Sequence, residues 1–175
     1  TIDFIIHAVA YSDKNELNGR YVDTSKDNFI NSLSISCYSF TRIAKIFQPI
    51  LNSGGSLVTL SFHGANKVMP NYNVMGVAKA ALETSVKYLS VDLGDQDVRV
   101  NAISAGPMRT LAGAAIANAR DVFNYTSENS SLKRNVNLDE LGNSALYLVS
   151  DLSSAITGEI HYVDCGFNIV GMPKS

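Results

Sequence analysis

Short apolar runs alternate with longer segments of helical periodicity along this chain, and this alternation restricts the fold more than any other feature. Four runs have the length and composition of buried strands: residues 2–10, 56–62, 98–104 and 159–166. Three segments between them repeat apolar residues at helical spacing: residues 25–51, 71–94 and 139–151. Such alternation predicts an α/β fold, in which helices cover both faces of a parallel sheet.

Residues typical of helix ends support these boundaries. Thr24 or Ser25 can cap the start of the first helix, and the sequence NSGG ends it. Gly94 supplies a stop for the second helix, and Asn137 supplies a cap for the last one. The chain before this last helix is harder to interpret, with a weak helix near 111–124 and then the polar sequence YTSENSS.

The length and composition suit one domain. The chain has 175 residues, of which 46% are hydrophobic and 17% charged, and this is enough for a sizeable core. The net charge of −2 and the scattered basic residues provide no electrostatic attraction to nucleic acid or to an anionic membrane surface. No apolar stretch approaches the roughly 20 residues that a membrane-spanning helix needs. We therefore expect no nucleic-acid partner and no membrane partner.

Cysteine and histidine residues are few and far apart: Cys37, Cys165, His7, His63 and His161. They do not have the spacing of a metal site or of a redox pair, so we expect no metal. Two lone thiols suit a reducing compartment such as the cytoplasm.

The chain opens with TIDFIIHAVA, which contains neither an initiator methionine nor a signal peptide. It enters a buried-type strand almost at once, and natural domains seldom begin in this way. We therefore expect residues 1–175 to be the carboxyl-terminal portion of a longer single domain.

Tyr72 and Lys79 stand out because they follow a strand end, where ligands bind in sheets of this kind. Seven residues make about two helical turns, so both side chains share one helix face. A phenol, with a pKa of about 10, is a proton donor at neutral pH, and a nearby ammonium favours negative charge on its partner. The pair suits a reaction in which an oxygen gains negative charge, such as hydride addition to a carbonyl or to a conjugated alkene.

Each of these signals has a plain structural alternative. A lysine whose stem packs beside a half-buried tyrosine needs no function, and most isolated Tyr-x6-Lys pairs are of this kind. The position beyond a strand end, with Gly76 and Ala78 allowing close helix packing, favours the functional interpretation. The sequence SAGPMRT at 104–110 can be a turn at Gly106 followed by a cap at Thr110, or a site whose free amides hold a carboxamide or phosphate.

Together these residues resemble the short-chain dehydrogenase/reductase superfamily, and more narrowly the NADH-dependent enoyl-acyl-carrier-protein reductases of bacterial fatty-acid synthesis. The hallmark of that family is Tyr-x6-Lys, where ordinary superfamily members have Tyr-x3-Lys. Four stretches carry the resemblance: HAVAYSDKNEL (7–17), PNYNVMGVAKAALE (70–83), VRVNAISAGPMRTLA (98–112) and SALYLVSDLSSAITGEIHYVDCG (144–166). The resemblance implies a Rossmann-like doubly wound parallel sheet, and it spans nearly the whole chain.

The resemblance also implies a reaction and a role for each site residue. NADH delivers hydride to a trans-2-enoyl thioester of acyl carrier protein, Tyr72 hydrogen-bonds the enolate oxygen, and Lys79 binds the nicotinamide ribose. The other implied cofactor contacts are Val9, Met108, Arg109, Thr110, Leu111 and Ala112. The implied acyl-pocket residues are Ala10, Tyr11, Ser12, Met75, Ala112 and Ile116. The weak helix after Thr110 is implied to be a mobile substrate lid, and the assembly a homotetramer.

The sequence departs from the family pattern in two places. The family usually has a second tyrosine ten residues before the catalytic one, and Phe62 stands there, so the hydroxyl is absent. The Gly-rich turn that binds the pyrophosphate belongs before Thr1, so we expect residues 1–175 alone to bind NADH poorly.

Two other functions stay open on the sequence alone. A ketone or alcohol reductase of the same superfamily needs a lysine four positions after the tyrosine, and Gly76 is there instead. A non-catalytic binding or assembly protein on the same fold would be consistent with Phe62, but it has no physical need for both Tyr72 and Lys79.

Overall fold

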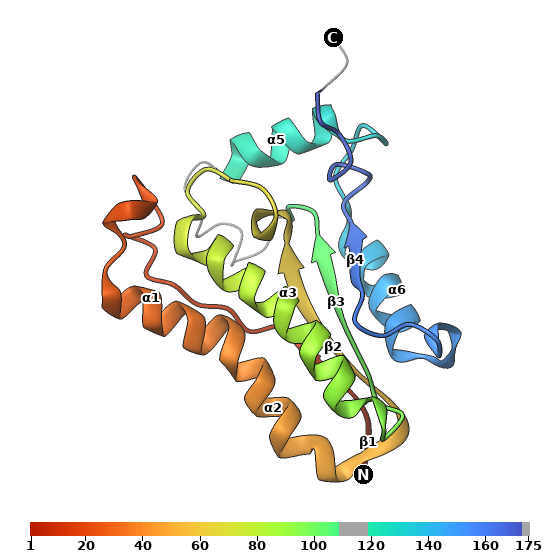
Figure 1. Ribbon diagram of the computed structural model, residues 1–175. Helices are drawn as coiled ribbons and strands as arrows, with labels where there is room; N and C mark the ends of the chain where they lie inside the picture. The colour runs from red at the N-terminus through yellow and green to blue at the C-terminus, as the bar shows by residue number, and fades with distance from the viewer. Residues whose placement is uncertain (109–118, 173–175) are drawn as a thin grey trace.

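The structure is a computed structural model of the chain, and it describes residues 1–108 and 119–172. In these residues the centre of the molecule is a parallel four-stranded sheet whose spatial order follows the chain (Figure 1). Its strands are β1 (Ile2–His7), β2 (Leu51–Phe62), β3 (Arg99–Ala105) and β4 (Ile160–Val163). The predicted parallel α/β sheet is therefore confirmed.

Helices lie on both faces of this sheet, as predicted (Figure 1). On one face are α1 (Lys26–Leu33), α2 (Ser39–Phe47) and α3 (Asn73–Gly94). The other face is covered by α6 (Leu138–Val149), while α5 (Ala119–Asn129) lies beyond the carboxyl ends of the strands.

Each face has its own apolar core. On the α3 side, Phe40 and Leu82 pack with Leu57 and Val100 of the central strands, and all four side chains are fully buried. On the α6 side, Leu148 packs with strand residues that point the opposite way, including Val58 and Ile103. The alternation of side chains along each strand thus serves both layers, which explains why the strand sequences are apolar almost throughout.

The segment predicted as one helix over 25–51 is built from several pieces. Ser25 caps α1 by accepting from the Asn28 amide, so one of the two predicted caps is confirmed. A π-helical turn, η2 (Ser34–Tyr38), separates α1 from α2, and a 3-10 turn, η3 (Gln48–Ile50), follows α2. The apolar spacing could not show the π turn. One extra residue in a turn shifts the later apolar residues around the helix axis, but the apolar pattern itself continues.

Three strand boundaries differ from the prediction by three residues or more, and one of them is the end of β4, at Val163 rather than at residue 166. β2 begins at Leu51 rather than at residue 56, because Leu51 already pairs with Ile2 across an irregularity in the register. β1 ends at His7 rather than at residue 10. In the described residues β1 is also only partly covered, with Phe4 50% exposed, although its apolar run predicts burial on both faces.

The later helices follow the sequence signals more closely. α3 ends at Gly94 as predicted, and Asn137 caps α6 in a capping box with Glu140. The predicted weak helix near 111–124 lies mostly outside the described residues, but α5 continues to Asn129 and includes most of the polar sequence YTSENSS, whose structure the sequence did not decide. No helix within residues 1–108 or 119–172 is long and apolar enough to cross a membrane.

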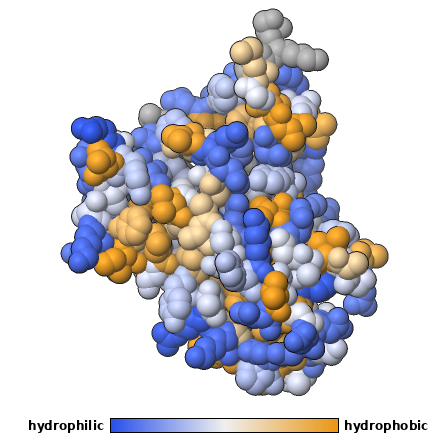
Figure 2. Space-filling view, in the orientation of Figure 1, coloured by the Kyte–Doolittle hydropathy of each residue, from blue (hydrophilic) through white to orange (hydrophobic). Residues whose placement is uncertain are grey.

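Apolar side chains are also exposed on the outer side of the α1–α3 layer, where patches of apolar surface lie over these helices (Figure 2). They include Ile30, Tyr38, Ile46, Tyr88 and Val91, each more than half exposed. This helical layer thus carries apolar surface that the described chain does not cover.

Candidate active site

The carboxyl end of β2 brings the predicted catalytic residues together. Leu60 and Phe62 lie at the end of β2. Leu60 contacts a residue of α3, the helix that follows, and Phe62 contacts the residue immediately before that helix. The Lys79 ammonium donates a hydrogen bond of 2.7 Å to the Leu60 carbonyl oxygen. The ring centroids of Phe62 and Tyr72 are 5.0 Å apart in an edge-on arrangement. The predicted trio of Tyr72, Lys79 and Phe62 therefore meets at one strand end.

Tyr72 stands immediately before the first turn of α3 and is 8% exposed. Asn71 and Asn73 on either side have φ values of 58° and 36°, in the left-handed region that asparagine tolerates better than most residues. Burial, together with the charge of Glu83, raises the pKa of Tyr72 above its ordinary value. The phenol therefore keeps its proton at neutral pH and is available as a hydrogen-bond donor.

Lys79 is 6% exposed, which is unusual for a lysine that forms no ion pair with the residues the structure describes. Burial lowers its pKa to about 8, although Cys37 and Glu83 oppose this shift. Below this pH the side chain is an ammonium with three N–H donors, and the Leu60 carbonyl takes one of them. The remaining donors can bind hydroxyl groups of a ligand at the strand end.

Glycine is required where the loop after β2 passes Tyr72. A Cβ atom at Gly64 would lie 2.5 Å from Cδ1 of Tyr72, and one at Gly76 would lie 2.8 Å from the Gly64 carbonyl oxygen. The turn η4 (His63–Ala65) and the start of α3 can therefore approach each other only with two glycines. This contact fixes the position of the phenol ring.

We expect Gly64→Ala to displace the Tyr72 ring and to lower turnover in the full-length protein about tenfold, because small misplacements of a reacting group reduce rates strongly. Gly142→Ala is the matched control: nothing lies within 4 Å of its added Cβ atom, and alanine favours the α6 helix. Steady-state rates with thermal melts of both variants check this. Equal rates for the two variants would contradict it.

The segment after β1, which the sequence predicts to border cofactor and substrate, is held from the side by α1 and η2. Val9 and Tyr11 expose 45% and 53% of their surface, and Ala10 is also exposed. Ser36 accepts from the Tyr11 amide at 2.9 Å and donates to its carbonyl at 3.0 Å. The segment thus presents side chains to solvent while its backbone is fixed.

Asn28 holds the next part of the same segment. Its side-chain oxygen accepts from the Ser12 hydroxyl at 3.2 Å and from the Asp13 amide at 3.0 Å. Sequence reasoning missed both Asn28 and Ser36. The only signal was that both are polar residues on the buried side of this helical segment. Which side is buried can be recognised only after the π turn is known.

Two methionines of the predicted site lie on opposite sides of the sheet end. Met75 is buried with Tyr72, and its sulfur is 3.7 Å from the Ser36 hydroxyl, so it lies close to the Tyr11 segment. Met108 packs at the edge of the core on the α6 side. The remaining predicted site residues lie outside the described residues: Arg109, Thr110, Leu111, Ala112 and Ile116. The predicted lid lies largely there as well.

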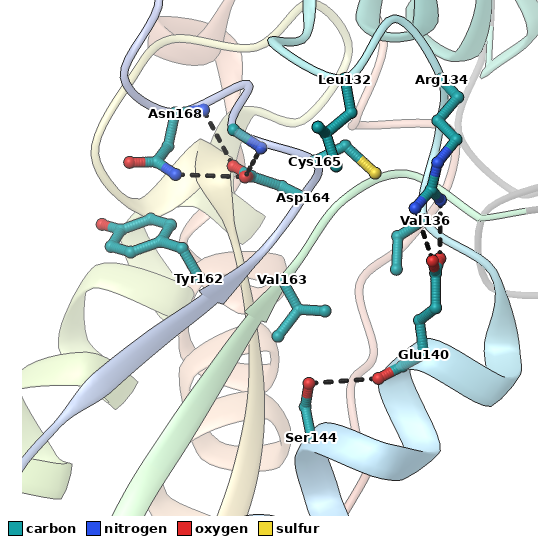
Figure 3. A pocket seen from close by; sticks show the side chains of 11 residues that line it. Leu132, Arg134, Val136, Glu140, Ser144, Tyr162, Val163, Asp164, Cys165 and Asn168 are labelled. Carbon is teal, nitrogen blue, oxygen red and sulfur yellow. Dashed lines mark hydrogen bonds and ion pairs between the residues drawn. The ribbon is translucent and has the colours of Figure 1, made fainter.

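A separate hollow of about 320 Å³ lies at the end of β4, between α6 and the chain that follows β4 (Figure 3). Arg134 and Glu140 form an ion pair of 2.6 Å at its rim, and Asp164 accepts from the backbone amides of Gly166 and Asn168. The side chains of these polar groups point toward one another rather than toward an open site. No predicted site residue is among the described residues that line it.

Two buried polar residues near the predicted site were not recognised from the sequence. His7 is 2% exposed, and its ring nitrogens lie 2.9 Å and 2.8 Å from the hydroxyls of Thr59 and Ser39. Burial and the charge of Lys79 lower the pKa of His7. Glu83 is 8% exposed and lies one helical turn after Lys79.

Within the described residues, no group of three or more potential metal ligands is found.

Comparison with known proteins gives one consistent result. The family described as "Enoyl-(Acyl carrier protein) reductase" matches residues 1–168. The chain is 59% identical over 171 residues to enoyl-[acyl-carrier-protein] reductase [NADH] 1 of Rhizobium meliloti (strain 1021). That match covers 98% of the chain and 63% of the relative, so the chain spans less than two thirds of the relative's length.

Solved structures agree with this match. The crystal structure of FabI from Candidatus Liberibacter asiaticus has a TM-score of 0.97 and 56% identity, covering 99% of this chain and 67% of that one. An enoyl-(acyl-carrier-protein) reductase from Anaplasma phagocytophilum, solved in complex with NAD, has a TM-score of 0.96 and 59% identity, covering 100% and 67%. The doubly wound, Rossmann-like character of the sheet is thus confirmed.

Proposed function

The chain belongs to the enoyl-(acyl carrier protein) reductase family, and on this basis we propose that the full-length protein reduces the trans-2 double bond of enoyl thioesters on acyl carrier protein, with NADH as the cofactor. The observation that carries the proposal is the placement of Tyr72 and Lys79, seven residues apart, at the carboxyl end of β2. The relatives bear the names of NADH enoyl reductases, which supports the same reaction.

The site residues suit this cofactor and reaction. When bound, NADH supplies the hydride that adds to the β-carbon of the thioester. Lys79, with its remaining N–H donors, would hold the ribose hydroxyls, and its positive charge would favour the negative charge that develops on the thioester oxygen. Val9 would lie against the cofactor from the end of β1, where its side chain is 45% exposed.

Tyr72 would donate its phenolic hydrogen bond to the thioester oxygen as the oxygen becomes an enolate. Its raised pKa keeps the proton in place before the reaction. The α-carbon then takes a proton supplied by solvent, which converts the enolate into the saturated acyl thioester. Ala10, Tyr11, Ser12 and Met75 would border the acyl chain, together with Ala112 and Ile116, which lie outside the described residues. Arg109, Thr110 and Leu111 complete the proposed cofactor contacts with Met108.

We also propose that residues 1–175 act as the carboxyl-terminal portion of a single reductase domain, whose Gly-rich phosphate-binding turn stands before Thr1. The partly exposed β1, with Phe4 and Ile6 uncovered in the described chain, supports a further layer of protein at this edge. A homotetramer in the cytoplasm completes the proposal. The exposed apolar residues of α1–α3 and the two free cysteines support these last two points.

The first experiment follows NADH oxidation by the full-length protein with a short trans-2-enoyl thioester and, in parallel, the matched 3-ketoacyl thioester. Turnover of the enoyl substrate alone is expected. Turnover of the keto substrate would instead assign a ketoreductase. Cofactor binding without turnover of either substrate would favour a non-catalytic protein on the same fold.

Phe62 tests how far the reaction depends on a second hydroxyl at this strand end. Its ring already packs edge-on against Tyr72, so the aromatic wall is present without the hydroxyl. We expect the rates of Phe62→Tyr and of the parent to differ by less than about tenfold. A rise of about 100-fold or more, which corresponds to about 2.7 kcal/mol of missing transition-state stabilisation, would contradict this expectation.

A further inference from the structure

A buried carboxylate lies behind the catalytic pair. Glu83 is four residues after Lys79 on α3 and 8% exposed, and glutamates are almost never buried this far without partners. Its partners come from the end of β2 and from the turn that follows. The Ser61 hydroxyl donates to one carboxylate oxygen at 2.5 Å, and the Asn66 side-chain amide donates to the other at 3.1 Å.

These contacts complete a pattern in which three consecutive strand residues each meet one residue of α3 or Tyr72, which immediately precedes it. The Leu60 carbonyl accepts from Lys79, the Ser61 hydroxyl donates to Glu83, and the Phe62 ring packs on Tyr72. Hydrogen bonds that involve a charged group are shorter and stronger than neutral ones, and both the Lys79–Leu60 and the Ser61–Glu83 contacts are of this kind. The Ser61–Glu83 contact lies between the two contacts that place the catalytic side chains.

Asn66 extends the contact to the other strands. Its amide also donates to the Tyr162 hydroxyl at 3.0 Å, which connects the turn after β2 with β4. Ser61, Ser104 and Tyr162 form one row across β2, β3 and β4, so the carboxylate faces a polar edge of the sheet. The titratable groups near it are Tyr72 just before α3, Lys79 on α3, His63 on η4 and Tyr162 on β4.

We propose that Glu83 is a positioning residue for the reaction, which ties α3 to the end of β2 and supplies negative charge that favours the ammonium form of Lys79. This inference rests on the proposed function and deepens it. Without the tie, Lys79 and Tyr72 would no longer be fixed to neighbouring points on one strand. Without the charge, the buried lysine would lose its proton at a lower pH.

The test compares Glu83→Gln with the parent in the full-length protein. The new amide keeps the size of the side chain and can still accept from Ser61, but its NH2 group cannot accept from Asn66, so the variant removes the charge and one hydrogen bond. We expect turnover to fall about tenfold and the alkaline limb of kcat/KM to move to lower pH by about one unit. Loss of the negative charge lowers the pKa of Lys79 and the pKa of Tyr72, so both shifts move the alkaline limb to lower pH.

Glu128→Gln is the matched control, because Glu128 is exposed on α5 and the substitution removes the same charge. Glu83→Asp is the conservative variant, and it should return the alkaline limb to its parental position because it keeps the charge. A residue with a merely structural role would lower the thermal midpoint and the rate at all pH values without moving the limb. An unchanged limb in Glu83→Gln overturns the proposal.

A second measurement does not depend on turnover. The pKa of Lys79, followed by ¹³C NMR of its ε-carbon, should be lower in Glu83→Gln than in the parent, and unchanged in Glu128→Gln. If the parent fails to reduce the enoyl thioester, the proposed function fails, while this titration still decides whether Glu83 acts on Lys79. Should Glu83→Gln not fold, Ser61→Ala replaces it, since it frees the carboxylate. That variant keeps the charge and removes the tie to β2, so an unchanged rate in it would overturn the proposal.

Discussion

We expect Tyr72→Phe to reduce kcat for the enoyl thioester by about 10²–10³-fold, the usual effect of removing one hydrogen-bond donor from a developing oxyanion. The ring should stay in place, because its edge-on contact with Phe62 and the close approach of Gly64 do not involve the hydroxyl. Binding of NADH should therefore be nearly unchanged. Steady-state kinetics with a separate measurement of NADH affinity check both parts.

Tyr88→Phe provides the control for this prediction. Tyr88 belongs to the same helix and is 72% exposed, so loss of its hydroxyl should leave the rate unaltered. If Tyr72→Phe retained more than about a tenth of the parental kcat, the phenol would not be the donor to the oxyanion.

Lys79→Met should have the second large effect. The substitution removes the ammonium that is proposed to hold the ribose, and it leaves the buried Leu60 carbonyl without its donor. We expect weaker NADH binding and a loss of about 10²–10³-fold in kcat/KM. Lys87→Met, at an exposed position two turns further along α3, should change neither quantity.

The pH dependence gives Lys79 an independent signature. Because burial lowers its pKa to about 8, kcat/KM of the parent should fall as pH rises through this value, and Tyr72, whose pKa is raised, does not account for such a limb. The contribution of Lys79 to stability has the opposite sign. Between about 8 and its ordinary pKa of 10.5 the unfolded chain binds more protons at this residue, so its contribution rises with pH.

The two trends can be separated by experiment. Rates and denaturant midpoints of the parent and of Lys79→Met are measured across this window, and the difference between the midpoints isolates the lysine. A fall in the parental rate together with a fall in the parental midpoint would mean that alkaline unfolding, and not deprotonation of Lys79, limits the reaction. A lysine contribution that falls as pH rises would mean that burial does not lower the pKa of Lys79.

Much of the fold could be predicted because its signals are local. Apolar runs located β2 and β3 to within a few residues, and Asn137 and Gly94 identified helix ends by their own chemistry. Tyr72 and Lys79 were found because seven residues on a helix have a fixed geometry. Their position at a strand end followed from the order of the elements alone.

The rest depends on contacts between distant residues. In the sequence, Glu83 resembles an ordinary surface charge on a helix. Only its hydrogen bond with Ser61, 22 residues earlier, shows that it is buried. Ser36 is equally plain until it meets Tyr11, 25 residues away. The early start of β2 depends on Leu51 pairing with Ile2, which no local pattern contains.

The π turn at Ser34–Tyr38 has a consequence for how this segment can vary in length. Its buried side chains recur every four residues, polar in the first part and apolar in the second: Asn28, Ser32, Ser36, Phe40 and Ala44. In a straight α-helix, residues four apart are offset by about 40° around the helix axis. The wider π turn has more residues per turn and so reduces this offset. Deleting one residue there would rotate α2 by about 100° relative to α1. A single deletion would thus remove the support of the Tyr11 segment and the core contact of Phe40 together, so insertions and deletions should be tolerated poorly here and better in the exposed loops.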